Sequence, residues 1–347
     1  MAIRILTIFA VLFFSSFTFA GEPGREPARA PAAAAPADHY NLFGDALVWT
    51  ATEDGLGFVV RCPGVPLGGG PTNGMIATDC DTVDLEPDWQ AGFRVGGGYT
   101  WSPDLWDLQV RWTWFKTNDS KALTGGTFYP TWTHPDVAVA AGLDVSAVAF
   151  WYLKFNSIDL EMGKTFKPGT FFTLRPHAGV KGAIIDQDFD ARYQNSTLVN
   201  STLNRHVIMS NDFGGVGFRG GFDAYWDLNW YGFSLFGKGS GSILFGEFKT
   251  HFLNRADSST YAHVRDSFNT TKGVLEGALG VNMHTTDLLG TEYPLDFYAM
   301  WEDQLFFSQN QIMRFMGDTT DDGKFIHEKG DLGFHGITFG IQVAFTI

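Results

Sequence analysis

Long apolar runs, basic side chains and cysteines are all scarce in this chain of 347 residues. After residue 20 no stretch stays apolar for about 18 residues, so no transmembrane helix is expected. Only 24 lysines and arginines stand against 38 acidic residues, which leaves a net charge of −14. Because phosphate binding requires a basic surface, this balance argues against nucleic acid as a partner.

Signatures of catalysis and of metal binding are also missing. None of the nine histidines has a second ligand at a metal-type spacing, and no G-x-S-x-G motif occurs. His206 with Asp212, or His251 with Asp257, could form acid–base pairs, but two such pairs are expected by chance in long polar segments. We therefore expect no catalytic residue, no metal and no cofactor.

The beginning of the chain has the pattern of a secretory signal. Ile5 to Phe14 is an apolar run broken only by a threonine, and it is too short for a membrane anchor. Small residues precede an expected cleavage after Ala20, so residues 1–20 are predicted to be a signal peptide. The Pro- and Ala-rich residues 21–38 predict a flexible linker.

From residue 39 to 347 the dominant pattern is strict alternation of apolar and polar residues. Residues 105–116 are the clearest case, with an apolar face of Trp106, Leu108, Val110, Trp112 and Trp114. The opposite face carries Asp107, Gln109, Arg111 and Thr113. A period of two indicates a sheet with one apolar and one polar face.

Ten such segments are separated by links that alternate between short and long. They are expected at residues 40–52, 89–101, 105–117, 145–166, 170–190, 213–226, 230–250, 272–286, 294–307 and 332–347. The long, polar links are expected at residues 53–88, 118–144, 191–212, 251–271 and 308–331. An even strand number with alternating links is typical of outer-membrane barrels, which have short periplasmic turns and long external loops.

Closure follows from the membrane itself, because in lipid only a closed barrel satisfies every backbone group of a sheet. We therefore predict an all-β, antiparallel, up-and-down transmembrane barrel of about ten strands, within a range of 8 to 12. Residues 55–60 could form an extra strand in the first long link. We expect the barrel to have an apolar outer band and a polar interior.

Parity places charged residues of both signs on the inward face. The candidates are Arg94, Asp107, Arg111, Lys154, Asp159, Glu161, Arg175, Lys181, Arg219, Asp223, Lys238, Glu276, Asp296 and Glu302. They could line a pore and set its ion selectivity. Alternatively, they form a mutually neutralising network that fills a narrow lumen, since small barrels are filled by side chains. A narrow polar pore through such a network is a third arrangement.

The segment 145–166 changes its parity part-way. Leu153 and Phe155 are apolar at odd positions, whereas Ile158, Leu160 and Met162 are apolar at even positions. A β-bulge near Asn156–Ser157 would reconcile the two halves.

Several segments also resemble the Legionella-type major outer membrane proteins and their relatives in chlamydia-related bacteria. The matching text includes GFRVGGGYTW at 92–101, LQVRWTWF at 108–115, FWYLKFNSIDLEMGKTF at 150–166 and FFTLRPHAGVKGAIIDQDF at 171–189, and it continues at 215–248. The resemblance implies an abundant, porin-like surface protein, with disulfide chemistry and host contact in some members. One departure is the last residue, Ile347, where barrel assembly signals usually end in an aromatic residue.

Cys62 and Cys80 both fall in the first long link. An even pair in an exported chain is a candidate for an intramolecular disulfide, worth about 3 kcal/mol. The resemblance keeps open the rival, intermolecular bonding into a surface lattice.

Two functions compete at this point. The first is a porin-like barrel of the bacterial outer membrane that admits small hydrophilic solutes by passive diffusion after Sec-dependent export. The second is a surface-exposed structural or adhesive barrel, plugged by ion pairs and loops. The expected partners are outer-membrane lipids and small hydrophilic solutes, with the host-cell surface or self-association through the loops as further partners.

Overall fold

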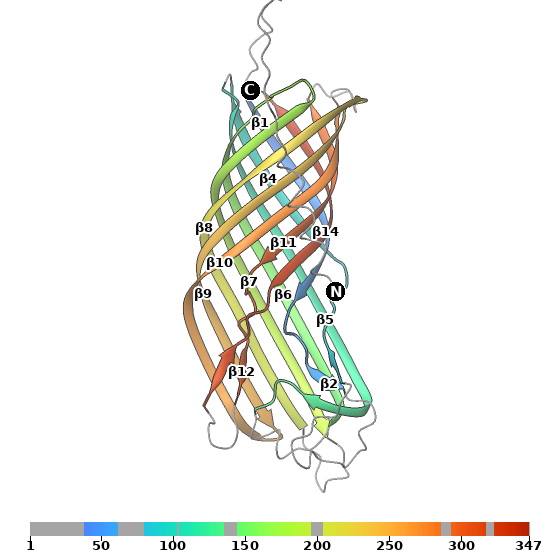
Figure 1. The fold of residues 1–347 in the computed structure, drawn as a ribbon, viewed down its shortest axis with the longest axis vertical. Helices are drawn as coiled ribbons and strands as arrows, with labels where there is room; N and C mark the ends of the chain where they lie inside the picture. The colour runs from blue at the N-terminus through green and yellow to red at the C-terminus, as the bar shows by residue number, and fades with distance from the viewer. Residues whose placement is uncertain are drawn as a thin grey trace, which may run out of the picture. The chain divides into compact units, whose positions relative to one another are not determined.

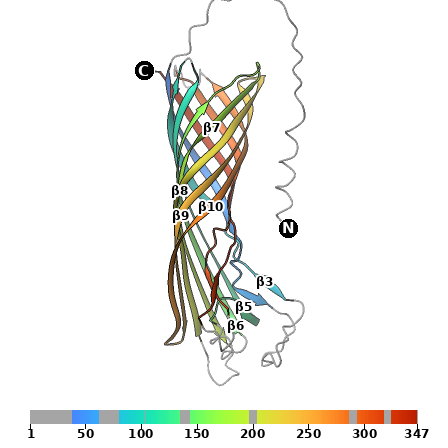
Figure 2. The same ribbon diagram turned by 60° about the vertical axis from the view of Figure 1, so that its left-hand side comes forward.

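In the computed structural model, ten long strands form one closed antiparallel barrel (Figures 1 and 2). The structure describes residues 38–61, 80–102, 104–134, 144–195, 204–285, 293–316 and 323–346. The predicted signal peptide, and the linker up to residue 37, lie outside the described residues and stay predictions. Among the described residues, no helix is long and apolar enough to cross a membrane.

Each barrel strand pairs with its neighbour along the chain, and the last pairs with the first. The strands are β1 (His39–Glu53), β4 (Gln90–Trp101), β5 (Trp106–Pro130), β6 (Asp144–Lys164), β7 (Phe172–Asn195), β8 (Asn204–Trp230), β9 (Phe233–Ala256), β10 (Ser259–Thr285), β11 (Leu295–Phe306) and β14 (Leu332–Phe345). The predicted fold and strand number are confirmed. In Figure 1 the C-terminus lies at the end with the short turns.

The external ends of several strands run much further than predicted. β5 continues to Pro130, although a loop was expected from residue 118. The expected long link 251–271 is wrong, because β9 and β10 meet in a two-residue turn at Asp257–Ser258. The sequence of these extensions indicates loops, because their outward side chains are polar.

The barrel wall inverts its polarity part-way along the strands. On β6, Asp159 and Glu161 face inward near the short turns, and the alternate residues Ile158 and Leu160 are exposed on the outside. Further along, the inward residues become apolar, with Phe155 fully buried. Outside the membrane the outer wall meets water and the inside can be dry, so the preferred polarity of each face reverses.

Two expectations are therefore wrong. The register between β5, β6 and β7 is unbroken through Asn156 and Ser157, so there is no bulge at that place. The interior is not polar throughout, because the change from Asp159 to Phe155 is a change of inward residue type and not of parity.

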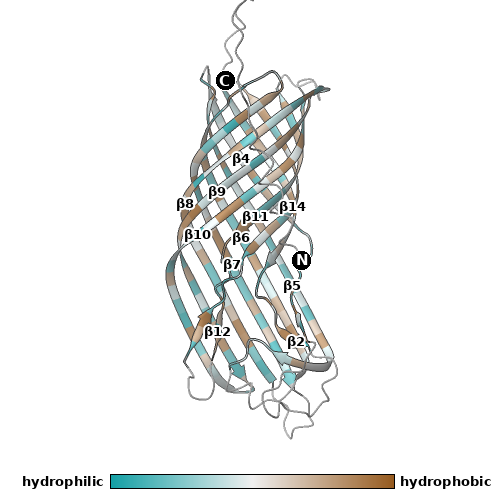
Figure 3. Ribbon diagram, viewed as in Figure 1, coloured by the Kyte–Doolittle hydropathy of each residue, from teal (hydrophilic) through white to brown (hydrophobic). Residues whose placement is uncertain are grey.

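Around the charged part of the barrel, outward apolar side chains form an exposed band. Hydrophobic and hydrophilic positions alternate along the barrel strands (Figure 3). Exposed aromatic residues stand beside the short turns, among them Trp106, Trp226 and Trp230. Trp89, Trp301 and His335 form a second outward aromatic group, with ring centroids 6.0–6.3 Å apart. Aromatic side chains at both edges of an apolar band are typical of membrane interfaces.

The external half is walled by β5 to β10 only, because these strands have 21–27 residues and the other four have 12–15. Two short pairs of strands cover the gap. β2 (Val59–Arg61) pairs with the end of β5 and with β3 (Asp81–Val83), and β12 (Met313–Phe315) pairs with β13 (Phe325–His327). Of residues 55–60, which could have formed an extra strand, only Val59 and Val60 are in a strand, as part of β2. Between wall and covers lies the apolar core.

Candidate functional site

The candidate site is the charged layer inside the membrane-spanning part of the barrel. Of the fourteen sequence candidates, all but Lys154 lie at inward positions. Nine of them are buried: Arg94, Asp107, Asp159, Glu161, Arg175, Lys181, Arg219, Asp223 and Glu302. Arg111, Lys238, Glu276 and Asp296 are partly buried on the same inward face.

Lys154 was assigned to the lumen wrongly. Its position has outward parity, its side chain is 44% exposed, and its Nζ lies 3.9 Å from Asp186. The expected bulge would have turned it inward, and the unbroken register leaves it outside.

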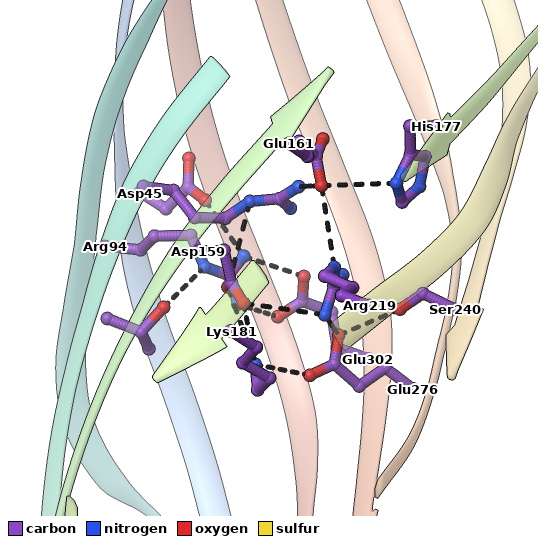
Figure 4. A network of polar contacts seen from close by, with 12 residues as sticks. Asp45, Arg94, Asp159, Glu161, His177, Lys181, Arg219, Ser240, Glu276 and Glu302 are labelled. Atoms are coloured by element: carbon purple, nitrogen blue, oxygen red, sulfur yellow. Dashed lines mark hydrogen bonds and ion pairs between the residues drawn. The ribbon is translucent and has the colours of Figure 1, made fainter. Parts of the chain in front are cut away.

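One part of the layer is centred on Arg94 of β4 (Figure 4). Its guanidinium binds Glu302 of β11 through two parallel hydrogen bonds of 2.8 and 3.0 Å, and Asp45 of β1 at 3.1 Å. Thr338 donates to Glu302 at 3.0 Å, and Tyr298 donates to Asp45 at 2.5 Å. A planar guanidinium facing two carboxylates is the arrangement that best offsets the cost of burying charge.

A second part is centred on Arg175 of β7. It donates to Asp107 of β5 at 2.5–3.1 Å, to Glu161 of β6 at 3.1 Å and to Asp223 of β8 at 2.8 Å. Glu161 also pairs with Arg111 and lies 3.4 Å from Nδ1 of His177. One arginine thus joins three strands besides its own.

The third part joins Lys181 of β7 to Asp159 at 3.1 Å and to Glu276 of β10 at 2.6 Å. Glu276 also pairs with Arg219 of β8 and accepts a hydrogen bond from Ser240 of β9 at 3.0 Å. Arg219 lies 3.5 Å from Glu161 and so connects this part to the second. With Thr338 on β14, every barrel strand contributes a side chain to the layer.

Two candidates lie at the margin of the layer. Asp296 accepts hydrogen bonds of 3.0 Å from Asn282 and pairs with His284 at the same distance. Nζ of Lys238 lies 5.3 Å from the ring of Phe236 and 5.9 Å from that of Tyr298.

Sequence reasoning missed Asp45, His177 and Tyr298 as members of the layer. Asp45 alternates with the inward Asn41 and Leu47, and His177 is two residues from Arg175, so parity could have found both. Nothing local in the sequence indicates the contact of Tyr298 with Asp45, which is 253 positions away.

These contacts fill most of the lumen at this level. A small cavity of about 40 Å³ remains between Arg111, Lys238, Glu276 and their neighbours. Towards the external end an aromatic layer follows, in which the ring of Phe334 lies 4.6 Å from that of Phe155 and 5.8 Å from that of Phe115. A hydrated solute would have to pass a charged and then an apolar constriction.

Other predicted pairs are rearranged. His206 contacts Asp190 at 2.9 Å and not Asp212, and the ring of His251 lies edge-to-face with that of His263, with centroids 5.1 Å apart. Cys80 is disulfide-bonded. Cys62 lies outside the described residues, so the pairing of these two cysteines stays a prediction.

Among the described residues, one group has a metal-type geometry: Glu161, His177 and Asp223. The two carboxylates are already bound by guanidinium groups of Arg175 and its neighbours. A divalent cation would have to displace these arginines, so the group fits a place in the ion-pair network better than a metal site.

Comparison with known proteins bears on the whole chain. A family model described as Legionella pneumophila major outer membrane protein precursor matches residues 37–345. The chain belongs to this family. Membership confirms the resemblance predicted from the strand text and places the protein in the bacterial outer membrane. No curated protein matches the chain.

Several solved structures align with this chain at very low identity and with low TM-scores. The outer membrane protease OmpT of Escherichia coli is 11% identical with a TM-score of 0.47, covering 91% of this chain and 99% of that one. A Pseudomonas aeruginosa FadL homologue is 9% identical with a TM-score of 0.26, covering 89% and 90%. The toluene transporter TodX of P. putida is 6% identical with a TM-score of 0.24, covering 92% and 91%.

Proposed function

We propose that this outer membrane protein is a surface-exposed structural barrel whose lumen is closed at rest. The proposal rests on one observation: two successive layers of side chains fill the lumen. Side chains from all ten strands join in the charged layer, and the aromatic layer lies beyond it. Ten strands also lie near the small end of the barrel range, where side chains fill the interior.

The test is conductance in a planar bilayer. Refolded full-length protein should insert repeatedly without discrete current steps. Insertion is checked independently by shifted migration of the unheated barrel on a gel and by protease protection in vesicles. Discrete, reproducible steps from the wild-type protein would overturn the closed-lumen proposal.

The second candidate is the porin-like passage of small hydrophilic solutes. It is supported by the polar cavity of about 40 Å³, which is lined by charges of both signs. A conducting protein whose ion selectivity changes in Glu276→Gln would favour this function, since charged rings set the field in a channel. Vesicles that do not swell in any small sugar would count against it.

A further inference from the structure

Beyond the lumen, the outer face of β5 and β6 carries an ordered column of side chains. Successive cross-strand pairs run from the membrane band towards the external end: Trp112 with Ile158, Trp114 with Asn156, Lys116 with Lys154, Asn118 with Tyr152, and Ser120 with Phe150. The first pair is apolar and exposed, at 42% and 54%. The third pair is the first charged row beyond the apolar band.

The two lysines stand directly opposite each other. Like charges in this arrangement destabilise a sheet. Nζ of Lys116 lies 5.8 Å from the ring of Trp114, and no described carboxylate is within ion-pair distance of it. Asp186, at 3.9 Å, neutralises Lys154 only partly because both side chains are about 40% exposed. The pair therefore presents a positive site in which Lys116 has no carboxylate partner among the described residues and Lys154 is only partly neutralised.

The pairs beyond the lysines have another chemistry. Tyr152 and Phe150 are exposed at 39% and 42%, although they lie past the apolar band where the outer wall is otherwise polar. Asn118 stands exposed beside Tyr152. Aromatic rings next to an amide suit a sugar, whose C–H faces pack on rings and whose hydroxyls bond with amides.

We propose that this column binds a phosphorylated glycolipid of the outer leaflet. Its acyl chains lie against Trp112 and Ile158, a phosphate lies between Lys116 and Lys154, and the sugar packs on Tyr152. The apolar row borders the lysine and aromatic rows on the wall, as the acyl chains of such a lipid border its phosphorylated sugar headgroup. A lipid is favoured over a soluble sugar phosphate because the lysines stand at the edge of the membrane band.

The test measures lipid binding to the refolded, full-length protein by native mass spectrometry. The probe is a diphosphorylated, acylated disaccharide lipid titrated into detergent micelles. K116A/K154A should weaken binding about thirtyfold, since each lysine near an anionic lipid surface contributes roughly a fivefold factor. The matched control K249A/R255A removes two exposed cations from β9 and should stay within about twofold.

Three further arms identify the ligand. The dephosphorylated lipid should bind the wild type about as weakly as the phosphorylated lipid binds K116A/K154A. Phosphatidylglycerol and inorganic phosphate should bind less tightly than the glycolipid, and Tyr152→Ala should lower binding of the glycolipid only.

Equal losses in both double variants would overturn the site. Equal binding of phosphatidylglycerol would overturn the glycolipid. Shifted gel migration of every unheated variant establishes that each barrel is folded.

Discussion

At the scale of single residues, the lumen shows how a buried charge is retained inside a membrane protein. Arg94 is buried, yet it faces two carboxylates, Asp45 and Glu302, and a threonine hydroxyl. Removing one member of a buried pair is strongly destabilising, because the remaining charge keeps its desolvation cost without its partner.

Glu302→Gln tests this. We expect the free energy of unfolding in urea to fall by about 3 kcal/mol, since Arg94 keeps only one carboxylate. Asp303→Asn, at the neighbouring exposed outward position, should cost less than about 1 kcal/mol. Equal effects of the two substitutions would show that the buried ion pair of Glu302 contributes no more to stability than an exposed carboxylate.

Glu53 is a second informative residue, at the external end of β1 and beyond the membrane band. Both carboxylate oxygens are buried. Burial raises the pKa of Glu53 to about 8, and Gln187 offsets this rise only in part. The folded protein therefore holds Glu53 neutral well above the pH at which the unfolded chain ionises it.

The stability that depends on neutral Glu53 is fully present below the unfolded pKa of about 4.5 and is lost as pH rises towards about 8. The urea midpoint of the wild type should fall more steeply between about pH 5 and pH 8 than that of Glu53→Gln. Parallel pH profiles would contradict a buried, protonated Glu53.

At the scale of elements, the hairpin of β12 and β13 acts as a cover. Met313 is 1% exposed, and the ring of Phe315 lies 4.9 Å from that of Phe252 on the wall. Its sequence is short, polar at the edges and without long alternation, so it could not be told from a loop. Only its contacts with the wall identify it as part of the core.

Met313→Ala tests the cover. Truncating a buried methionine costs about 2–5 kcal/mol, so proteolysis within residues 309–330 should become faster. Met316→Ala, at a side chain that is 51% exposed, should leave the rate nearly unchanged. If both variants were cleaved at the wild-type rate, the hairpin would not depend on this packing.

At the scale of the whole molecule, the inversion of wall polarity divides the barrel into a membrane-spanning half and a water-exposed half. Leu160 and Phe150 both face outward on β6, with similar exposures of 43% and 42%. Leu160 lies in the apolar band and Phe150 lies beyond it.

Arginine substitutions at these two positions test the division. Leu160→Arg should make folding into vesicles less favourable by about 2–4 kcal/mol, as expected for arginine on a lipid-facing wall. Phe150→Arg should change it by less than about 1 kcal/mol, since that position meets water. Similar costs at both positions would contradict the membrane boundary between them.

Much of the protein could be predicted from the sequence because alternation is a local property. Within residues 105–116 each residue reveals the face of its neighbours, so ten strands, closure and thirteen inward charges follow from parity and from the membrane requirement. Lys154 was misplaced because a polar-to-apolar change on one face has the same local pattern as a bulge.

What only the tertiary structure decided is which side chains meet across the lumen and how far the wall extends. Arg94 and Glu302 are 208 positions apart, and no local pattern couples them. The strand ends beyond residue 118 have the sequence pattern of loops, because their outward side chains meet water and are polar. Alternation records that a strand has two faces, whereas the surroundings of the folded barrel determine which face must be polar.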